Sequence, residues 1–300
     1  MVGVKLKSNN LLLIVLMILI STSSIACAES AVKDNNISIT EKHSMKENNQ
    51  NEQEDKKHPK GTNITLLSKE EILNKYKNLK PKEFGEHVNG IIDNLNTKEK
   101  VIALTLDACG GNHGSEYDKE LIDYLVSNNM PATLFINSRW IDSNMQTFKE
   151  LSSNPLFDIE NHGTLHKPLS VDGKSAYKIK GTNSQEEALK EVLDNHEKIE
   201  KLTGRKPKFF RAGTANYDDI SINMLKDLKI KVIGFNINGD AGATFSENMV
   251  YKSVTKSQNG SIIICHMNKP RGSTAEGLKK SLPKLISEGY RFVKLEEYIK

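Results

Sequence analysis

Two histidines four residues apart, His162 and His166, form the most compact chemical signal in the sequence. Histidines at this spacing can direct both imidazole rings at one metal ion. A bare pair of this kind is also compatible with two loop histidines that make ordinary hydrogen bonds. Here the pair directly follows a strand-like run, FDIEN (157–161), and that position favours a metal site.

Polar side chains follow four further apolar, strand-like runs in the same way. They are Asp107, Arg211, Asp240 and His266. The carboxyl ends of parallel strands meet at one rim of a barrel or one edge of an open sheet. We therefore expect these side chains to converge with the two histidines on one site, an arrangement that core packing does not explain.

The elements that must position them alternate regularly from residue 101 to residue 300. Strand-like runs rich in Ile, Val and Phe cover 101–106, 132–137, 157–161, 208–213, 231–237, 261–267 and 291–296. Helical patterns cover 117–129, 184–204, 218–229 and 274–289. Such alternation predicts an α/β fold with a parallel sheet covered on both faces. Seven strands favour a barrel or near-barrel, with a doubly wound open sheet as the alternative.

The N-terminal segment has the features of an export signal. Lys5 and Lys7 precede an apolar run (11–20) that is too short to span a bilayer as a helix. The residues after this run fit two kinds of processing: cleavage after Ala28, or a lipobox in which Cys27 carries a lipid. A retained hydrophobic anchor is the third alternative. We expect residues 1–28 to be a signal peptide or lipoprotein signal. The protein would then be extracytoplasmic, either secreted or lipid-anchored at the outer face of a bacterial membrane.

The composition between this signal and the strands predicts a tether. Residues 29–65 are dense in Asn, Glu, Lys and Ser, with almost no apolar periodicity, so we expect them to be disordered. Residues 66–100 form a lead-in segment to a domain at 101–300. The net charge of +4 is too small to indicate a nucleic-acid partner. We expect membrane contact only through a lipid on Cys27.

Two cysteines remain in the domain, Cys109 and Cys265. Two cysteines do not make a disulfide framework, and we interpret them as small, buried hydrophobic residues.

Five segments in order resemble the motifs of the NodB-type polysaccharide deacetylases, carbohydrate esterase family 4. They are LTLDACGG (104–111), NHGTLH (161–166), FFRAG (209–213), INGDAG (237–242) and IIICHMN (262–268). The resemblance covers roughly residues 97 to 300 and implies a distorted (β/α)7 barrel. It also implies hydrolysis of N-acetyl groups on N-acetylglucosamine-type residues of a polysaccharide, with peptidoglycan or a chitin-like oligomer as the substrate.

The resemblance further implies a role for each matching residue. His162 and His166 are the metal ligands, and Asp107 is the general base, oriented and kept ionised by Arg211. His266 is the general acid, and Asp240 supports its charge. Ile264 lines the pocket for the acetyl methyl group, and the backbone N–H of Thr214 faces the oxyanion. The implied cofactor is a divalent metal, with zinc expected and cobalt or nickel as alternatives.

Three positions depart from the family pattern, and Ala108 matters most. The family places a metal-binding aspartate there, so its absence puts metal occupancy in question. Water, His113 or Asp107 could complete the site, and an aspartate restored at position 108 is expected to strengthen it. Thr214 and Ala241 also differ from the usual residues and suggest an altered sugar groove. Two alternatives to a deacetylase follow: a glycan-binding barrel that has lost its metal, and a small-molecule amide hydrolase of the same fold.

Overall fold

The computed structural model describes residues 67–300. The predicted signal at 1–28 and the predicted tether at 29–65 lie outside the described residues. Within 67–300, no helix combines the length and the apolar character needed to cross a membrane.

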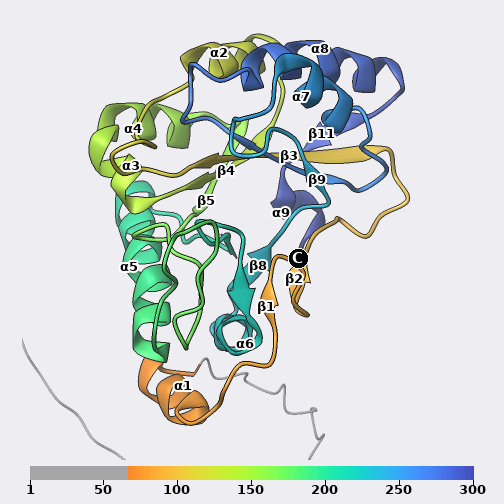
Figure 1. The fold of residues 1–300 in the computed structure, drawn as a ribbon. Coiled ribbons are helices and arrows are strands. Elements are labelled where there is room, and N and C mark those ends of the chain that lie inside the picture. The colour runs from red at the N-terminus through yellow and green to blue at the C-terminus, as the bar shows by residue number, and fades with distance from the viewer. Residues whose placement is uncertain (1–66) are drawn as a thin grey trace, which may run out of the picture. The chain divides into compact units, whose positions relative to one another are not determined.

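A curled, parallel, nine-stranded sheet forms the centre of the fold (Figure 1). Its order is β2-β8-β6-β5-β4-β3-β10-β9, and β11 pairs with β3. The strands are β2 (Ile91–Ile92), β3 (Val101–Ala108), β4 (Ala132–Ile136), β5 (Phe157–Asn161), β6 (Phe209–Phe210), β8 (Lys231–Ile233), β9 (Ile237–Asn238), β10 (Ile262–His266) and β11 (Arg291–Val293). The end strands β2 and β9 do not pair with each other, so the sheet is a half-barrel. The predicted α/β fold of the distorted-barrel type is confirmed.

The opening of the barrel falls within a run that the sequence predicts as one strand. Residues 231–237 form β8 and the start of β9, which pair with neighbours at opposite ends of the sheet. Residues 234–236 thus carry the chain across the opening. Gly234 lies so close to β2 that an added Cβ would stand 2.7 Å from the Ile91 side chain. The close approach of β2 explains why a residue without a side chain stands at the crossing.

Helices cover the outer face of the sheet in two groups. Apolar side chains of α2 (Lys119–Ser127), α3 (Ser138–Ser143), α4 (Met145–Ser153), α7 (Glu247–Val254) and α8 (Thr274–Ser287) form one cluster with residues of β3, β4, β5 and β10. We call this set the helix-side cluster. A second cluster joins α1 (Lys69–Tyr76), α5 (Gln185–Thr203) and α6 (Asp219–Asp227). Figure 1 shows α2, α7 and α8 together above the sheet and α5 along one side.

Strand β3 is buried on both faces, and its side chains alternate between two environments. Ile102, Leu104, Leu106 and Ala108 belong to the helix-side cluster. Val101 and Ala103 belong to a smaller cluster inside the curled sheet. Alternation follows from the two-residue period of a strand, and it decides which residues near the end of β3 reach the barrel interior.

The predicted lead-in segment is part of the same fold. After α1, β1 (Phe84–Gly85) pairs with β7 (Tyr217–Asp218) in a two-stranded antiparallel sheet. Strand β2 then joins the main sheet beside β8. The last predicted strand, 291–296, is shorter than expected, because β11 gives way to α9 (Leu295–Tyr298).

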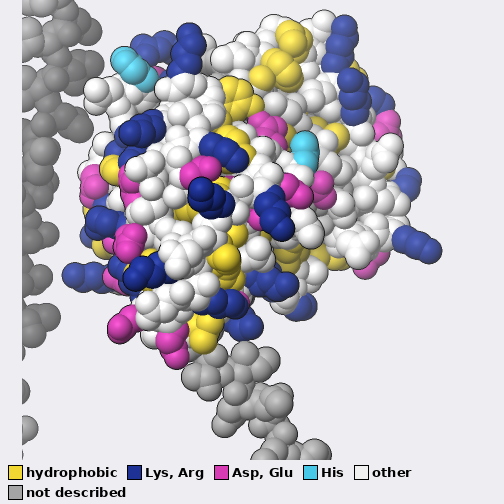
Figure 2. Space-filling model, turned by 60° about the horizontal axis from the view of Figure 1, so that its bottom comes forward, with side chains coloured by type: hydrophobic (Ala, Val, Ile, Leu, Met, Phe, Trp, Pro, Cys, Tyr) yellow, Lys and Arg dark blue, Asp and Glu magenta, His cyan; other side chains and the backbone are white. Residues whose placement is uncertain are grey.

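Figure 2 shows one face of the molecule, on which basic and acidic side chains are interspersed. Among the described residues, several acidic and basic side chains form ion pairs, such as Lys75 with Asp227 at 2.7 Å and Lys208 with Glu296 at 2.8 Å. This face therefore offers mixed charge rather than a field of one sign.

Candidate functional site

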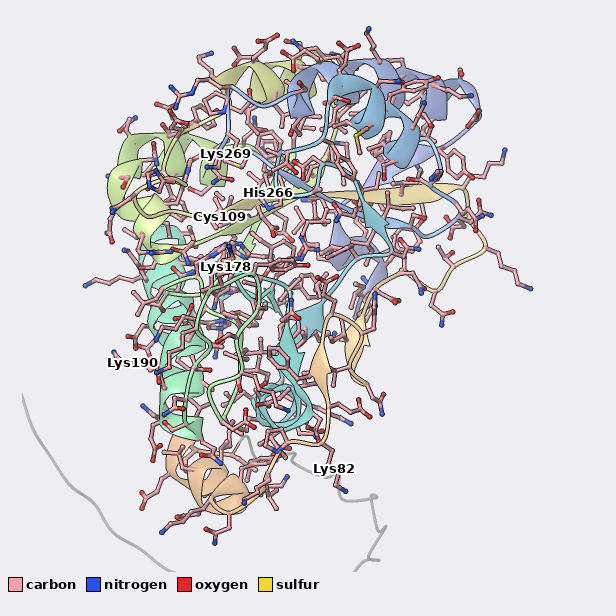
Figure 3. The ribbon with its side chains drawn as sticks, in the orientation of Figure 1. Lys82, Cys109, Lys178, Lys190, His266 and Lys269 are labelled. Atoms are coloured by element: carbon pink, nitrogen blue, oxygen red, sulfur yellow. The ribbon has the colours of Figure 1, made fainter. Side chains whose placement is uncertain are left out.

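A cavity of about 530 Å³ lies at the carboxyl ends of β3 and β10. Figure 3 shows Cys109, His266 and Lys269 close together in the middle of the domain, and all three line this cavity. Its lining residues come from the predicted motifs, from loops between them and from the lead-in segment. The polar and apolar lining side chains include Glu86, Asp107, Cys109, His113, Arg139, His166, Tyr177, Ile179, Thr214, Phe235, Asn238, Ile264, His266, Asn268 and Lys269.

Asp107 is held by a fully buried arginine. Nη1 of Arg211 donates to Oδ1 of Asp107 at 2.8 Å and to the hydroxyl of Thr105 at 2.8 Å. The same guanidinium donates to the carbonyls of Ile233 (3.3 Å) and Gly234 (2.8 Å), at the start of the barrel opening. Burial raises the pKa of Asp107, but the positive charges of Arg211, His162 and His266 together outweigh it, and the pKa is lowered. Asp107 is therefore an anion with one carboxylate oxygen free of Arg211.

His266 forms the second ion pair, beside Asp107. The two residues are register partners in the parallel strands β10 and β3. Nδ1 of His266 lies 2.9 Å from Oδ1 of Asp240, while Oδ2 of Asp240 accepts from the backbone N–H of His266 (2.7 Å) and from Thr274 (2.9 Å). Burial lowers the pKa of His266, but Asp240, with a smaller contribution from Cys109, outweighs it and raises the pKa well above its ordinary value. His266 thus carries a proton next to a carboxylate that does not.

His162 is buried and has one ring nitrogen available. Its Nδ1 lies 2.9 Å from the carbonyl of Arg211, and since a carbonyl can only accept, Nδ1 carries the hydrogen. In the neutral imidazole the lone pair is then on Nε2, which lies 3.6 Å from Oδ2 of Asp107. A backbone partner on the far nitrogen is the usual way in which a protein orients a metal-ligating histidine.

His166 also has an available ring nitrogen. Its buried Nε2 finds no hydrogen-bond partner in the described part of the chain. The rings of His162 and His166 stand edge to face, with centroids 4.9 Å apart. Gly213 makes room for this approach, because a Cβ there would lie 2.5 Å from Cγ of His166.

The loop that carries both histidines is held by helix α5 and strand β4. Glu191 of α5 accepts from the backbone N–H groups of Leu165 and Lys167, on either side of His166. Asn137, which follows β4, donates to the carbonyls of His162 (3.0 Å) and Gly163 (2.8 Å). The histidine loop is therefore fixed before any ligand arrives.

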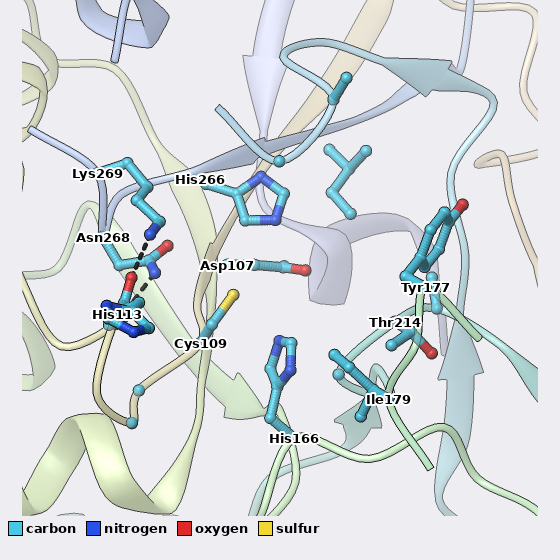
Figure 4. Close-up of a pocket in the computed structure, with 18 of the residues that line it drawn as sticks. Asp107, Cys109, His113, His166, Tyr177, Ile179, Thr214, His266, Asn268 and Lys269 are labelled. Atoms are coloured by element: carbon cyan, nitrogen blue, oxygen red, sulfur yellow. Dashed lines mark hydrogen bonds between the residues drawn. The ribbon is translucent and has the colours of Figure 1, made fainter. Parts of the chain in front are cut away.

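The cysteine after β3 joins the two histidines. One ligand atom from each of Cys109, His162 and His166 lies within 4.8 Å of the others, a grouping that could hold one metal ion. Figure 4 shows the Cys109 sulfur directed toward the space between Asp107, His166 and His266. Burial raises the pKa of this thiol, but the neighbouring histidines, His166 first, outweigh it and hold the pKa well below its usual range.

The interpretation of both cysteines as buried hydrophobic residues is wrong for Cys109. Cys265 is fully buried in the helix-side cluster, and both cysteines are free. His113, which was considered as a replacement ligand, lines the cavity but is not in the three-residue group. Cys109 escaped prediction because the sequence does not show on which residue β3 ends.

Further lining residues carry little signal in the sequence. Thr214 and Ile264, which the family resemblance places at the substrate pocket, both line the cavity. Tyr177 and Ile179 come from the loop between β5 and α5, and Glu86 comes from the lead-in segment. The Tyr177 side chain is 73% exposed and its hydroxyl donates to Glu86. The one sequence feature that could have indicated Tyr177 as a site residue is an aromatic side chain in a segment without apolar periodicity.

Comparison with protein families gives a match over residues 94–233 to the model described as polysaccharide deacetylase. Among curated proteins, the chain is 25% identical over 207 residues to a peptidoglycan-N-acetylglucosamine deacetylase of Bacillus cereus, covering 67% of this chain and 89% of that protein. It is 22% identical over 198 residues to the uncharacterised protein YlxY of Bacillus subtilis, covering 65% of this chain. The match spans 56% of the length of YlxY.

Solved structures share the fold. Bacillus subtilis PdaA, a family 4 carbohydrate esterase, aligns with a TM-score of 0.58 at 21% identity, covering 76% of this chain and 87% of that one. A pseudoenzyme of carbohydrate esterase family 4 from Bacillus anthracis aligns with a TM-score of 0.56 at 22% identity, covering 67% and 66%. The fold is thus found both in a protein named as an esterase and in one named as a pseudoenzyme.

Proposed function

The chain belongs to the NodB-type polysaccharide deacetylases of carbohydrate esterase family 4, and on this premise we propose that it is an active N-deacetylase. It would hydrolyse the N-acetyl group of N-acetylglucosamine-type residues in a cell-wall polysaccharide, peptidoglycan or a chitin-like oligomer, and release acetate. One observation carries the proposal. Asp107, paired with Arg211, and His266, paired with Asp240, stand side by side on neighbouring strands at the cavity, next to the imidazole rings of His162 and His166.

Hydrolysis of an acetamide needs an activated water, stabilisation of the oxyanion and a proton for the leaving nitrogen. A divalent metal, with zinc expected and cobalt or nickel as alternatives, supplies Lewis-acid activation of the water and of the acetyl carbonyl when bound. The free imidazole nitrogens of His162 and His166 fit such an ion. A family 4 acetyl xylan esterase of Clostridium thermocellum, solved with a cobalt ion, aligns with a TM-score of 0.54 at 23% identity and supports this cofactor class.

The proton transfers fall to the two charged pairs. Asp107 accepts the proton of the attacking water, and Arg211 both fixes its carboxylate and favours its ionised form. His266 donates its proton to the leaving amine, and Asp240 stabilises the charge on His266. Ile264 would contact the acetyl methyl group, and the Thr214 backbone N–H would face the oxyanion; both residues line the cavity.

The proposed substrate also suits the proposed location. A signal at residues 1–28, with or without a lipid on Cys27, would place the domain outside the cytoplasmic membrane, where peptidoglycan lies. The curated relative named as a peptidoglycan-N-acetylglucosamine deacetylase supports the choice of polymer.

Acetate release is the decisive measurement. The purified chain would be assayed on N-acetylglucosamine oligomers and on peptidoglycan, after chelation and after addition of zinc or cobalt, with Asp107→Asn as the inactive control. Metal-dependent release that this variant lacks supports the proposal. Glycan binding without release in any metal would indicate the binding-barrel alternative, which the pseudoenzyme neighbour makes worth testing. Release only from small acetylated amides would indicate the third alternative.

A further inference from the structure

We propose that the thiolate of Cys109 is the third protein ligand of the metal site, so that the chain holds its metal through one sulfur and two imidazole nitrogens. Cys109 takes this part only if the domain is the metal-dependent protein proposed above. The consequence is a softer site than one built from a carboxylate and two histidines.

The register of β3 excludes position 108 from the site. Ala108 pairs with Ile136 of β4 and is fully buried in the helix-side cluster. Asp107 points to the opposite face, toward the cavity. Cys109, one residue beyond the end of β3, lines the cavity again. A ligand in this part of the chain therefore comes from position 107 or 109, and not from 108.

The geometry of Cys109 fits coordination. Its Sγ lies 3.9 Å from Nε2 of His162. Ligand atoms about 2.0–2.3 Å from one tetrahedral ion stand roughly 3.3–3.7 Å apart. A shift of a few tenths of an ångström would therefore let Sγ and Nε2 bind the same ion. On His162 the lone pair is on Nε2, and on His166 the buried Nε2 has no partner within residues 67–300.

Asp107 is not part of the three-residue group. Its Oδ1 accepts from Arg211, and its Oδ2, 3.6 Å from Nε2 of His162, is left to accept a proton as the proposed general base. The sulfur of Cys265, the other cysteine of the domain, is buried in the helix-side cluster, away from the cavity. Cys265 thus provides a matched control within the same chain.

A sulfur ligand would determine which metals the site prefers. Binding of a divalent ion forms a metal–sulfur bond and releases the thiol proton to solvent. Thiolate and imidazole ligands suit zinc and cobalt, whereas magnesium and manganese prefer oxygen. Two imidazoles and one thiolate leave the fourth tetrahedral position open, as in catalytic zinc sites. We expect zinc and cobalt to bind tightly and magnesium to bind poorly.

Cobalt(II) titration of the metal-free, full-length chain under reducing, oxygen-free conditions tests this directly. The wild-type chain and Cys265→Ser should develop a near-ultraviolet thiolate-to-cobalt charge-transfer band with equal intensity. Cys109→Ser should lose that band. In competition with a chromophoric chelator, Cys109→Ser should also bind zinc at least roughly tenfold to a hundredfold more weakly, the loss typical even when only a group supporting a ligand is removed.

A second variant guards against misfolding. Cys109→Asp should regain most of the zinc affinity through a carboxylate oxygen, without the charge-transfer band. Persistence of the band in Cys109→Ser, unchanged zinc affinity in that variant, or a wild-type cobalt complex without the band would overturn the proposal. So would a wild-type chain that binds neither metal.

No substrate enters these titrations, so the two proposals can fail separately. A chain that binds cobalt through Cys109 but releases no acetate refutes the deacetylase and keeps the ligand. A chain that releases acetate and shows no thiolate band keeps the deacetylase and loses the ligand.

Discussion

In the proposed reaction, Asp107 and His266 divide the proton transfers between two charge states, and a buried partner favours each state. Arg211 favours the anion at Asp107, and Asp240 favours the cation at His266. Loss of either side chain would remove a proposed proton transfer rather than a packing contact.

We predict that Asp107→Asn and His266→Ala each lower the rate of acetate release by roughly a hundredfold to ten-thousandfold. Steady-state kinetics on an N-acetylglucosamine oligomer measure the loss, and circular dichroism checks that the fold is kept. Near-normal release by either variant would show that its role is assigned to the wrong residue.

Ala108→Asp gives a second prediction at this scale, and it reverses the expectation drawn from the sequence. An aspartate there would be a carboxylate within the helix-side cluster, without a partner, and it should not reach the metal. Breaking a buried charge pair costs roughly 3–5 kcal/mol, and an unpaired buried carboxylate is penalised on the same scale. Urea unfolding should show a loss of that order, with no gain in zinc affinity. Cys109→Asp, with the same carboxylate one residue later, is the control and should unfold near the wild-type midpoint. A stable, tighter-binding Ala108→Asp would restore the original expectation.

The positions of Asp107, Arg211, Asp240 and His266 at strand ends predicted that they converge. The structure places Asp107 and His266 at one cavity, with Arg211 and Asp240 hydrogen-bonded to them. The strand-end positions could not supply Cys109. A shift of one residue exchanges the two faces of a strand, and nothing in LTLDACGG shows whether 108 or 109 is the first residue to leave the sheet. The residue type does not decide the question either, because a single cysteine is compatible both with a buried core position and with a metal ligand.

Among the elements, strand β5 has chemistry at both ends. Its carboxyl end leads to His162, while Asp158 near its amino end is buried beside Glu160 and lines a smaller cavity with Glu296. Oδ2 of Asp158 has no hydrogen-bond partner in the described region. Burial, assisted by the charge of Glu296, raises the pKa of Asp158 to about 6.

Asp158→Asn should therefore stabilise the domain, and the gain should depend on pH. Since the pKa in the folded state is raised above the ordinary 3.8, the wild type loses stability as the pH rises from about 4 to about 6, while the variant does not. We expect a gain on the order of 2 kcal/mol in the free energy of unfolding at pH 8 and almost none at pH 4. Denaturant titrations at both values test this. An equal gain at the two pH values would attribute the effect to packing instead.

The loop between β5 and α5 supplies the most exposed aromatic ring at the cavity, Tyr177. An amphipathic ring at the rim can cover an apolar face of a sugar. Tyr177→Ala should raise KM for an oligosaccharide roughly three- to tenfold and leave kcat nearly unchanged. Tyr177→Phe keeps the ring and removes the hydroxyl that donates to Glu86. Equal losses in both variants would assign the effect to that hydrogen bond and not to the ring.

Elements of strong periodicity were predicted well, and short ones were not. Helices α2, α5, α6 and α8 lie within their predicted ranges, because each has a clear apolar stripe. Helices α3 and α7 have six and eight residues, too few to establish a period. The division of 231–237 into two strands depends on the neighbours of β8 and β9, which lie far away in the sequence.

At the scale of the whole molecule, the segment before β3 belongs to the domain. Ile72, Val88 and Leu95 are buried, and β2 extends the main sheet. Removal of residues 1–66 should leave the midpoint of thermal unfolding and acetate release unchanged, in keeping with the predicted tether. Removal of residues 1–97 should destabilise the domain by several kcal/mol, since each buried side chain of this kind contributes about 1.5–3 kcal/mol. Calorimetry of both truncations measures the difference. A stable, active 98–300 fragment would contradict the assignment.

The strand that carries Asp107 has an unusual set of neighbours, with a consequence for how the protein is made. One edge of β3 pairs with β10 along its length, while the other is divided between β11 at residues 101–103 and β4 at residues 105–108. Contacts between residues so distant in sequence form late, because the loop between them must first be closed. Until Arg291–Val293 have been synthesised, the first half of β3 lacks a partner on that edge. A growing chain therefore cannot complete the pairing of the strand that carries Asp107 until β11 has been synthesised.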